Sequence, residues 1–120
     1  PVVFLYTFLR KGRCKDMVIP KEVKVLYKEY AVEEQSNLHN ENGDLYGQIQ
    51  YIEEKIILNA DASAGQKKST LVHELLHALD EMYNIELEEK QVEKLGKALY
   101  MLQLDNPQLF ADSGEVTLSD

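Results

Sequence analysis

The chain has 120 residues, which is enough for one small hydrophobic core and not for two. Its hydrophobic content of 44% and charged content of 28% are ordinary for a globular protein. A formal net charge of −8 argues against a nucleic-acid or anionic-membrane partner, because either would repel an acidic surface. The single cysteine, Cys14, cannot form an internal disulfide, so a reducing cytoplasm is the expected location.

Residues 1–16 differ in composition from the rest of the chain. They are apolar from Pro1 to Leu9 and then basic. The apolar run is shorter than the roughly 20 residues that span a bilayer, and its basic cluster follows the run, whereas that of a secretory signal precedes it. Two interpretations of this N-terminal extension stay open: a short extra strand or docking tail, and sequence upstream of the functional start. We favour the second, with the domain beginning near Met17, and assign the segment no function.

The first part of this domain is predicted to be β structure. Polar and apolar residues alternate over residues 22–32, which predicts a half-buried strand with Val23, Val25 and Tyr27 facing inward and a bend near Glu29. This period of two is typical of a strand that covers a core with one face.

A polar loop and a hairpin should follow. The loop spans residues 33–44 and contains His39, which we expect to be solvated rather than metal-bound. The hairpin consists of an alternating strand at 46–51, a turn at 52–55 and a short apolar strand at 56–58.

The most informative segment is HELLH at residues 73–77, which uses two of the three histidines in the chain. Residues four apart lie on the same face of a helix, so the imidazoles of His73 and His77 should lie side by side with Glu74 next to them. This is the His-Glu-x-x-His arrangement of zinc proteases, with two ligands and a general base. An amphipathic helix with incidental histidines is the alternative, but burying unpaired histidines in such an apolar helix would be costly.

The motif helix is predicted to begin near Gly65, or at a Ser69–Thr70 cap, and to end near Tyr83. A second helix should start near Leu87 and stop before Pro107. Its expected apolar stripe recurs at three- and four-residue steps and comprises Val92, Leu95, Leu99 and Leu102.

These elements predict an α+β fold, in which a short antiparallel or mixed sheet packs against the motif helix and a second, C-terminal helix. The expected arrangement is a small zincin-like metallopeptidase domain at residues 17–110, followed by an acidic tail at 111–120.

A catalytic zinc site normally has a third protein ligand and an open position. The metzincin pattern is excluded, because Asp80 and Tyr83 stand where its glycine and third histidine belong, and the lone cysteine lies far upstream. The third ligand should therefore be acidic and come from the second helix, where Glu88 and Glu89 are candidates and Glu93 ranks third. Asp80 shares the face of the histidines, which suits a carboxylate that accepts an imidazole N–H.

Residues 73–80 (HELLHALD), followed by 89–96 (EKQVEKLG), resemble the ImmA/IrrE-type metallopeptidases, the DUF955-like group, and are most similar to its short phage and mobile-element members. The resemblance extends over nearly everything from Met17 to Phe110. It implies that Glu89 is the metal-binding glutamate, with Glu88 as the alternative. The family has a later motif that corresponds to residues 89–96, and this chain matches only its spacing and its apolar positions.

Motif and resemblance together imply a zinc-dependent endopeptidase of the gluzincin type. His73, His77 and Glu89 would hold Zn²⁺, and Glu74 would act as general base. The relatives that the resemblance implies are intracellular and act on repressors or other regulators, so a regulator protein is the expected partner.

Two features of the site stay open at the level of sequence. Tyr51, Tyr83 and Tyr100 are equivalent candidates for stabilising an oxyanion, and the exposed edge of the sheet could bind an extended substrate by strand addition. A metal-stabilised binding module with little or no activity is the alternative function, because so short a chain has little wall for a deep cleft. A purely structural zinc site is disfavoured, since such sites are usually closed by four Cys or His ligands.

Overall fold

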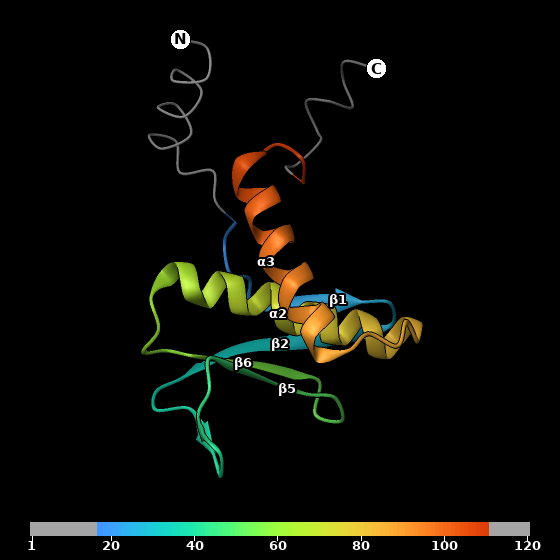
Figure 1. The fold of residues 1–120 in the computed structure, drawn as a ribbon. Helices are drawn as coiled ribbons and strands as arrows, with labels where there is room; N and C mark the ends of the chain where they lie inside the picture. The colour runs from blue at the N-terminus through green and yellow to red at the C-terminus, as the bar shows by residue number, and fades with distance from the viewer. Residues whose placement is uncertain (1–16, 111–120) are drawn as a thin grey trace, which may run out of the picture. The chain divides into compact units, whose positions relative to one another are not determined.

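The computed structural model describes residues 17–110, so the predicted extension at 1–16 and the predicted tail at 111–120 lie outside the described residues. The described part contains two helices and six strands, two of them very short (Figure 1): β1 (Glu22–Val25), β2 (Lys28–Gln35), β3 (His39–Asn40), β4 (Gly43–Asp44), β5 (Gly47–Gln50), β6 (Lys55–Asn59), α2 (Ala64–Tyr83) and α3 (Glu89–Asp105). The predicted α+β fold class is confirmed.

Four of the strands form one mixed sheet in the order β1-β2-β6-β5. β2 and β6 are parallel, whereas β1 pairs with β2, and β5 with β6, in the antiparallel sense. β3 and β4 form a separate two-stranded hairpin. The predicted hairpin is therefore present as β5 and β6, and β5 lies at one edge of the sheet.

The predicted single strand at residues 22–32 is wrong. The segment forms two antiparallel strands, β1 and β2, joined by a tight turn at Leu26 and Tyr27 with Val25 opposite Lys28. Leu26 takes a left-handed conformation with φ 58°, which hairpin turns require but which usually recruits Gly, Asn or Asp. Tyr27, expected to face inward, is 77% exposed at this turn.

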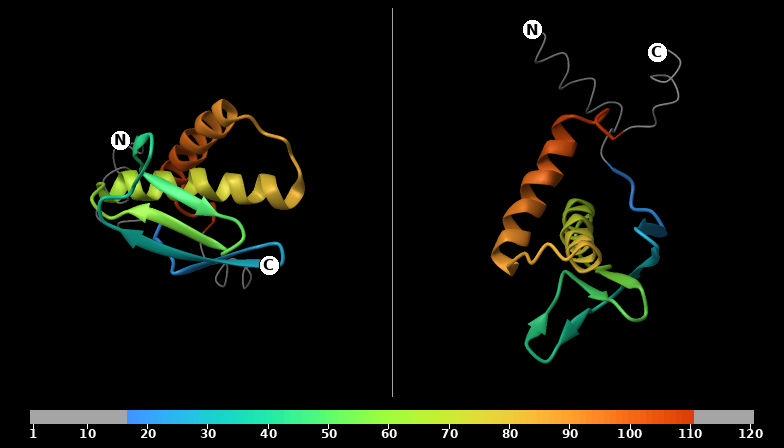
Figure 2. Two further views of the ribbon diagram at one scale, coloured as in Figure 1. Left: turned by 90° about the horizontal axis from the view of Figure 1, so that it is seen from below. Right: turned by 90° about the vertical axis from the view of Figure 1, so that its right-hand side faces the viewer.

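The core lies between the sheet and α2, which runs along one face of the strands (Figure 2). In the register of the sheet, Gly47 pairs with Leu58 and Ile49 with Ile56, so these residues share the face beneath α2. At the same face Lys67 of α2 makes an ion pair of 2.9 Å with Glu34 of β2. The largest fully buried side chains are Tyr30, Ile56, Leu58, Leu71 and Val92.

α2 begins one residue before the predicted start. The backbone N–H of Gln66 donates to the hydroxyl of Ser63, the N-cap residue, at 3.1 Å. The helix ends at Tyr83 as predicted, and Asn84 follows in a left-handed conformation with φ 54°. This places the HELLH segment in the middle of a long, well-capped helix.

α3 starts at Glu89, two residues later than predicted, and stops at Asp105 before Pro107, as predicted. Beyond its end, the backbone N–H of Asn106 donates to the carbonyl oxygen of Leu102 at 3.0 Å. Neither of the two helices in the described region combines the length and the apolar character that crossing a membrane demands.

The apolar stripe predicted for α3 is only partly the buried one. Leu95 and Leu99 are 42% and 37% exposed. The buried positions recur instead at four-residue steps, at Val92, Gly96 and Tyr100. A methyl group on Gly96 would lie 3.5 Å from the Cα of His73, so the glycine brings the two helix backbones close together. A hydrophobicity pattern does not reveal such a contact, because glycine contributes no apolar side chain.

Candidate metal centre

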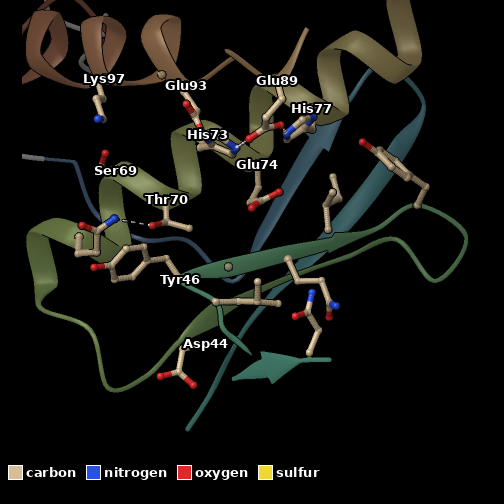
Figure 3. A pocket seen from close by; sticks show the side chains of 18 residues that line it. Asp44, Tyr46, Ser69, Thr70, His73, Glu74, His77, Glu89, Glu93 and Lys97 are labelled. Atoms are coloured by element: carbon tan, nitrogen blue, oxygen red, sulfur yellow. Dashed lines mark hydrogen bonds and ion pairs between the residues drawn. The ribbon is translucent and has the colours of Figure 1, made fainter. Parts of the chain in front are cut away.

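Two helices bring three potential metal ligands together (Figure 3). His73 and His77, one turn apart on α2, face each other with ring centroids 5.0 Å apart. Glu89, the first residue of α3, extends its carboxylate between them. Its Oε2 lies 3.1 Å from Nε2 of His73, and its Oε1 lies 3.0 Å from Nε2 of His77.

The donor atoms of these three residues suit a zinc ion in both number and chemistry. They lie within 4.8 Å of one another. Ligands of a tetrahedral zinc ion, each about 2.1 Å from the metal, are about 3.4 Å apart, so only small shifts of the side chains are needed. Two imidazole nitrogens and one carboxylate oxygen also match the His₂Glu set of known catalytic zinc sites.

Glu74 lies next to this cluster on α2 and is only 7% exposed. Burial, and then the negative charge of Glu89, raise the pKa of the Glu74 carboxyl to about 7. A carboxylate whose pKa lies near neutrality can both accept and release a proton at physiological pH. The structure therefore places a buried proton-transfer group beside three potential metal ligands.

A close contact between β5 and α2 positions Glu74. A methyl group on Gly47 would collide with the side-chain methyl of Thr70 and would lie 3.4 Å from Oε2 of Glu74. Only glycine therefore lets the edge strand approach the motif helix at this point. The same approach places the carboxylate of Glu74 against the backbone of β5.

The cluster opens into a pocket of about 760 Å³ between α2, the first half of α3 and β5. Along α3 its lining includes Glu89, Glu93 and Lys97, which recur at four-residue steps and so share one side of the helix. Glu93, the third-ranked ligand candidate, is thus a pocket residue, although it is not a member of the His-His-Glu group. It lines the pocket because the buried side of α3 is formed by Val92, Gly96 and Tyr100 and not by the predicted stripe.

The three tyrosines predicted as candidates for stabilising an oxyanion differ in whether they line the pocket. Tyr51 lines it, whereas Tyr83 is 55% exposed outside it and Tyr100 is buried on α3. Burial, and then the charges of Glu81 and Glu74 among others, raise the pKa of Tyr51 to about 12, so its hydroxyl remains a hydrogen-bond donor at neutral pH. Tyr46, which the sequence did not single out, also lines the pocket.

Asp80, which was predicted to accept an imidazole N–H, instead accepts backbone N–H groups. Its Oδ1 accepts the backbone N–H of Glu86 at 2.6 Å, and both carboxylate oxygens accept that of Leu87 at 3.3 Å. These bonds close the loop between α2 and α3. Asp80 thereby helps to return the chain to the histidines within a short interval.

His39 and Glu88, the other residues considered as metal ligands, lie outside the His-His-Glu group. His39, in β3, is exposed, and its Nδ1–H donates to the carbonyl oxygen of Asn37 at 2.7 Å. Glu88 precedes α3, and its backbone N–H donates to the side chain of Gln91 at 2.9 Å. The group that could hold a metal ion among the described residues contains Glu89 and not Glu88.

The mixed sheet, the motif helix and the His-His-Glu group are the features of a metallopeptidase domain. The family model Peptidase_M78, the IrrE N-terminal-like domain, matches residues 22–104, and the chain belongs to this family. The predicted ImmA/IrrE type is confirmed. A search of curated proteins and a search of solved structures found no match. Membership of a peptidase family makes this a metallopeptidase-type protein, whose substrates are proteins or peptides.

Proposed function

We propose that the protein is a zinc-dependent endopeptidase of the gluzincin type, in which His73, His77 and Glu89 hold Zn²⁺ and Glu74 is the general base. The observation that carries this proposal is the position of Glu74. A buried carboxylate with a pKa of about 7 lies beside three convergent metal donors. Glu74 is not a member of that group, so holding a metal does not explain its burial.

A bound Zn²⁺ would polarise the scissile carbonyl and lower the pKa of a nearby water molecule. Glu74 takes the proton of that water on a carboxylate oxygen and later delivers it to the leaving amine. The positive charge of the ion would bring the pKa of Glu74 below its value of about 7 and so favour the ionised, proton-accepting form. Tyr51, neutral throughout this cycle, is the tyrosine that we assign to stabilising the oxyanion.

The edge strand β5 offers a way to hold the substrate. One of its edges pairs with β6, and its other edge pairs with no strand in residues 17–110. Three of its residues line the pocket: Gly47, Gln48 and Ile49. An extended peptide that adds to this free edge would pass along the pocket with its backbone fixed by hydrogen bonds.

The partner that we propose is a regulator protein such as a repressor, in a cytoplasmic setting. An endopeptidase needs an extended segment in its substrate, which a regulator can present in a linker or an exposed loop. The alternative function, a metal-stabilised binding module, would need the three ligands but not Glu74.

The test combines metal analysis with an activity assay. The parent, the Glu74→Gln variant and a Glu22→Gln variant, which loses an exposed glutamate outside the pocket, are analysed for zinc and incubated with unfolded protein. We expect one zinc ion in all three and cleavage by the parent and Glu22→Gln only. Zinc without cleavage by any of them would favour the binding module, and absence of zinc would contradict the proposed site.

A further inference from the structure

Charge is unevenly distributed along the pocket. Its lining contains four acidic residues, Asp44, Glu74, Glu89 and Glu93, but Lys97 is its one basic side chain apart from the histidines. Lys97 therefore places one positive charge in a pocket whose other charged side chains, apart from the histidines, are carboxylates. Its surroundings indicate what it could bind.

Lys97 is free to bind a ligand. No ion pair joins it to any residue between 17 and 110, although Glu93 lies one helical turn away. Figure 3 shows the reason: the carboxylate of Glu93 is on the side of His73, whereas the ammonium group of Lys97 points across the pocket toward Ser69. Asp44 lies on the opposite side of the pocket from Lys97.

Two polar side chains of α2 complete this end of the pocket. Ser69 and Gln66 are half-buried and line it. The amide of Gln66 donates to the hydroxyl of Thr70 at 3.0 Å, which fixes its orientation and leaves its second N–H unused by that bond. Gln66 lies in the first turn of α2, where the helix dipole favours negative charge, and Ser69 lies in the next turn.

The backbone around Lys97 is held in place. Its neighbour Gly96 is buried against the backbone of His73, so Lys97 has a fixed position along α3 relative to the metal ligands. Eight residues separate Lys97 from Glu89 in the sequence, which at 1.5 Å per residue is about 12 Å along the helix axis. An extended peptide covers this distance in about three to four residues.

We propose that Lys97, with Ser69 and Gln66, forms a carboxylate-binding subsite that selects substrates with an acidic side chain about two to four residues from the scissile bond. The lower limit allows for the reach of the lysine side chain back toward the metal centre. The inference rests on the proposed peptidase function, because it assigns substrate selectivity to the same pocket.

The test uses peptides derived from a sequence that the parent cleaves, with Glu, Gln or Lys placed in turn at each of the four positions on either side of the scissile bond. We expect the parent to prefer Glu over Lys by about two- to fivefold in kcat/KM at two to four residues from that bond, the range of one exposed ionic contact. Lys97→Glu should reverse this preference. Lys94→Glu is the matched control, since it makes the same charge change at an exposed position of α3 outside the pocket.

Binding provides a second readout that does not depend on turnover. The same peptides, labelled for fluorescence anisotropy, are titrated into the Glu74→Gln protein with and without Lys97→Glu. A preference for Glu that is lost with Lys97→Glu supports the subsite, and added salt should reduce that preference. Cleavage or binding with equal charge preference in parent, Lys97→Glu and Lys94→Glu overturns the subsite but leaves the peptidase intact. Loss of zinc-dependent cleavage in the parent would instead count against the proposed function.

Discussion

Gly47 in β5 lies so close to Thr70 in α2 that a methyl group added to the glycine would collide with the methyl group of the threonine. The carbonyl oxygen of Ile57 would lie 3.2 Å from that added methyl, so the methyl would also be crowded by the backbone of β6. The distance between β5 and α2 at this point therefore depends on the absence of a side chain at Gly47 and on the size of the side chain at Thr70.

This contact predicts a specific pattern of rescue. Gly47→Ala should destabilise the fold by about 1–3 kcal/mol through overpacking, and it should lower activity by displacing Glu74. Thr70→Ser removes the opposing methyl and keeps the hydroxyl that Gln66 contacts. In a double-mutant cycle by urea unfolding, Gly47→Ala should cost less in the Thr70→Ser background than alone. Equal costs in the two backgrounds would show that the collision is relieved elsewhere.

Exchanging each of two adjacent glutamates tests the third ligand. Glu89→Gln should weaken zinc binding by about a hundredfold or more, because loss of a direct ligand should exceed the 10- to 100-fold effect of outer partners. Glu88→Gln, the matched control, should bind zinc like the parent. Competition with a chromogenic chelator measures both affinities, and the opposite ranking would reassign the ligand to Glu88.

The pKa of Glu74 predicts how the stability of the metal-free protein depends on pH. The carboxyl has a pKa of about 7 in the fold against a usual 4.5, so the native state retains a proton that the unfolded state releases between these values. The free energy of unfolding should therefore fall as pH rises from about 4.5 to about 7, by at most about 3 kcal/mol, and then stay level with respect to this group.

Glu74→Gln isolates this effect, because glutamine does not titrate. In a chelator, the stability of the variant relative to the parent should increase from pH 4.5 to pH 8 by up to about 3 kcal/mol in urea unfolding. A difference between Glu74→Gln and parent that is constant over this range would contradict the buried, protonated carboxyl.

Asp80 should link loop closure to metal affinity. Asp80→Ala removes the acceptor for the backbone N–H groups of Glu86 and Leu87, which should cost about 1.5–3 kcal/mol of stability for bonds to a charged group. It should also weaken zinc binding, since Glu89 follows this loop. Asp80→Asn should be milder, because its amide oxygen still accepts. Thermal unfolding and zinc titration of both variants measure these effects, and unchanged zinc affinity in Asp80→Ala would separate the loop from the site.

The parts of the fold that follow from local chemistry were predictable from the sequence. The end of α2 at Tyr83 follows from Asn84, which readily takes the left-handed conformation that ends a helix. The end of α3 at Asp105 follows from Pro107, which disfavours a helix at and before its own position. The convergence of His73 and His77 follows from helical periodicity alone. These predictions needed no knowledge of how distant segments pack.

The parts that depend on tertiary packing were not predictable in the same way. The turn at Leu26 lacks the residues that usually mark a positive φ, so its sequence reads as continuous strand. The buried side of α3 is set by Gly96 against His73, a contact that leaves no trace in a hydrophobicity pattern. Glu93 and Lys97 line the pocket because of this orientation of α3. Asp80 accepts hydrogen bonds from the loop between α2 and α3, a contact that the sequence pattern does not predict.

The division of the three metal donors between two helices has a mechanical consequence. Two donors belong to α2 and one to α3, so an ion held by them would act as a removable cross-link that closes the loop between the helices. Metal loading and the docking of α3 would then be one thermodynamic event, since the free energy of binding the ion is also free energy of folding. The supply of the ion would thus set both the activity of the protein and its lifetime against other proteases.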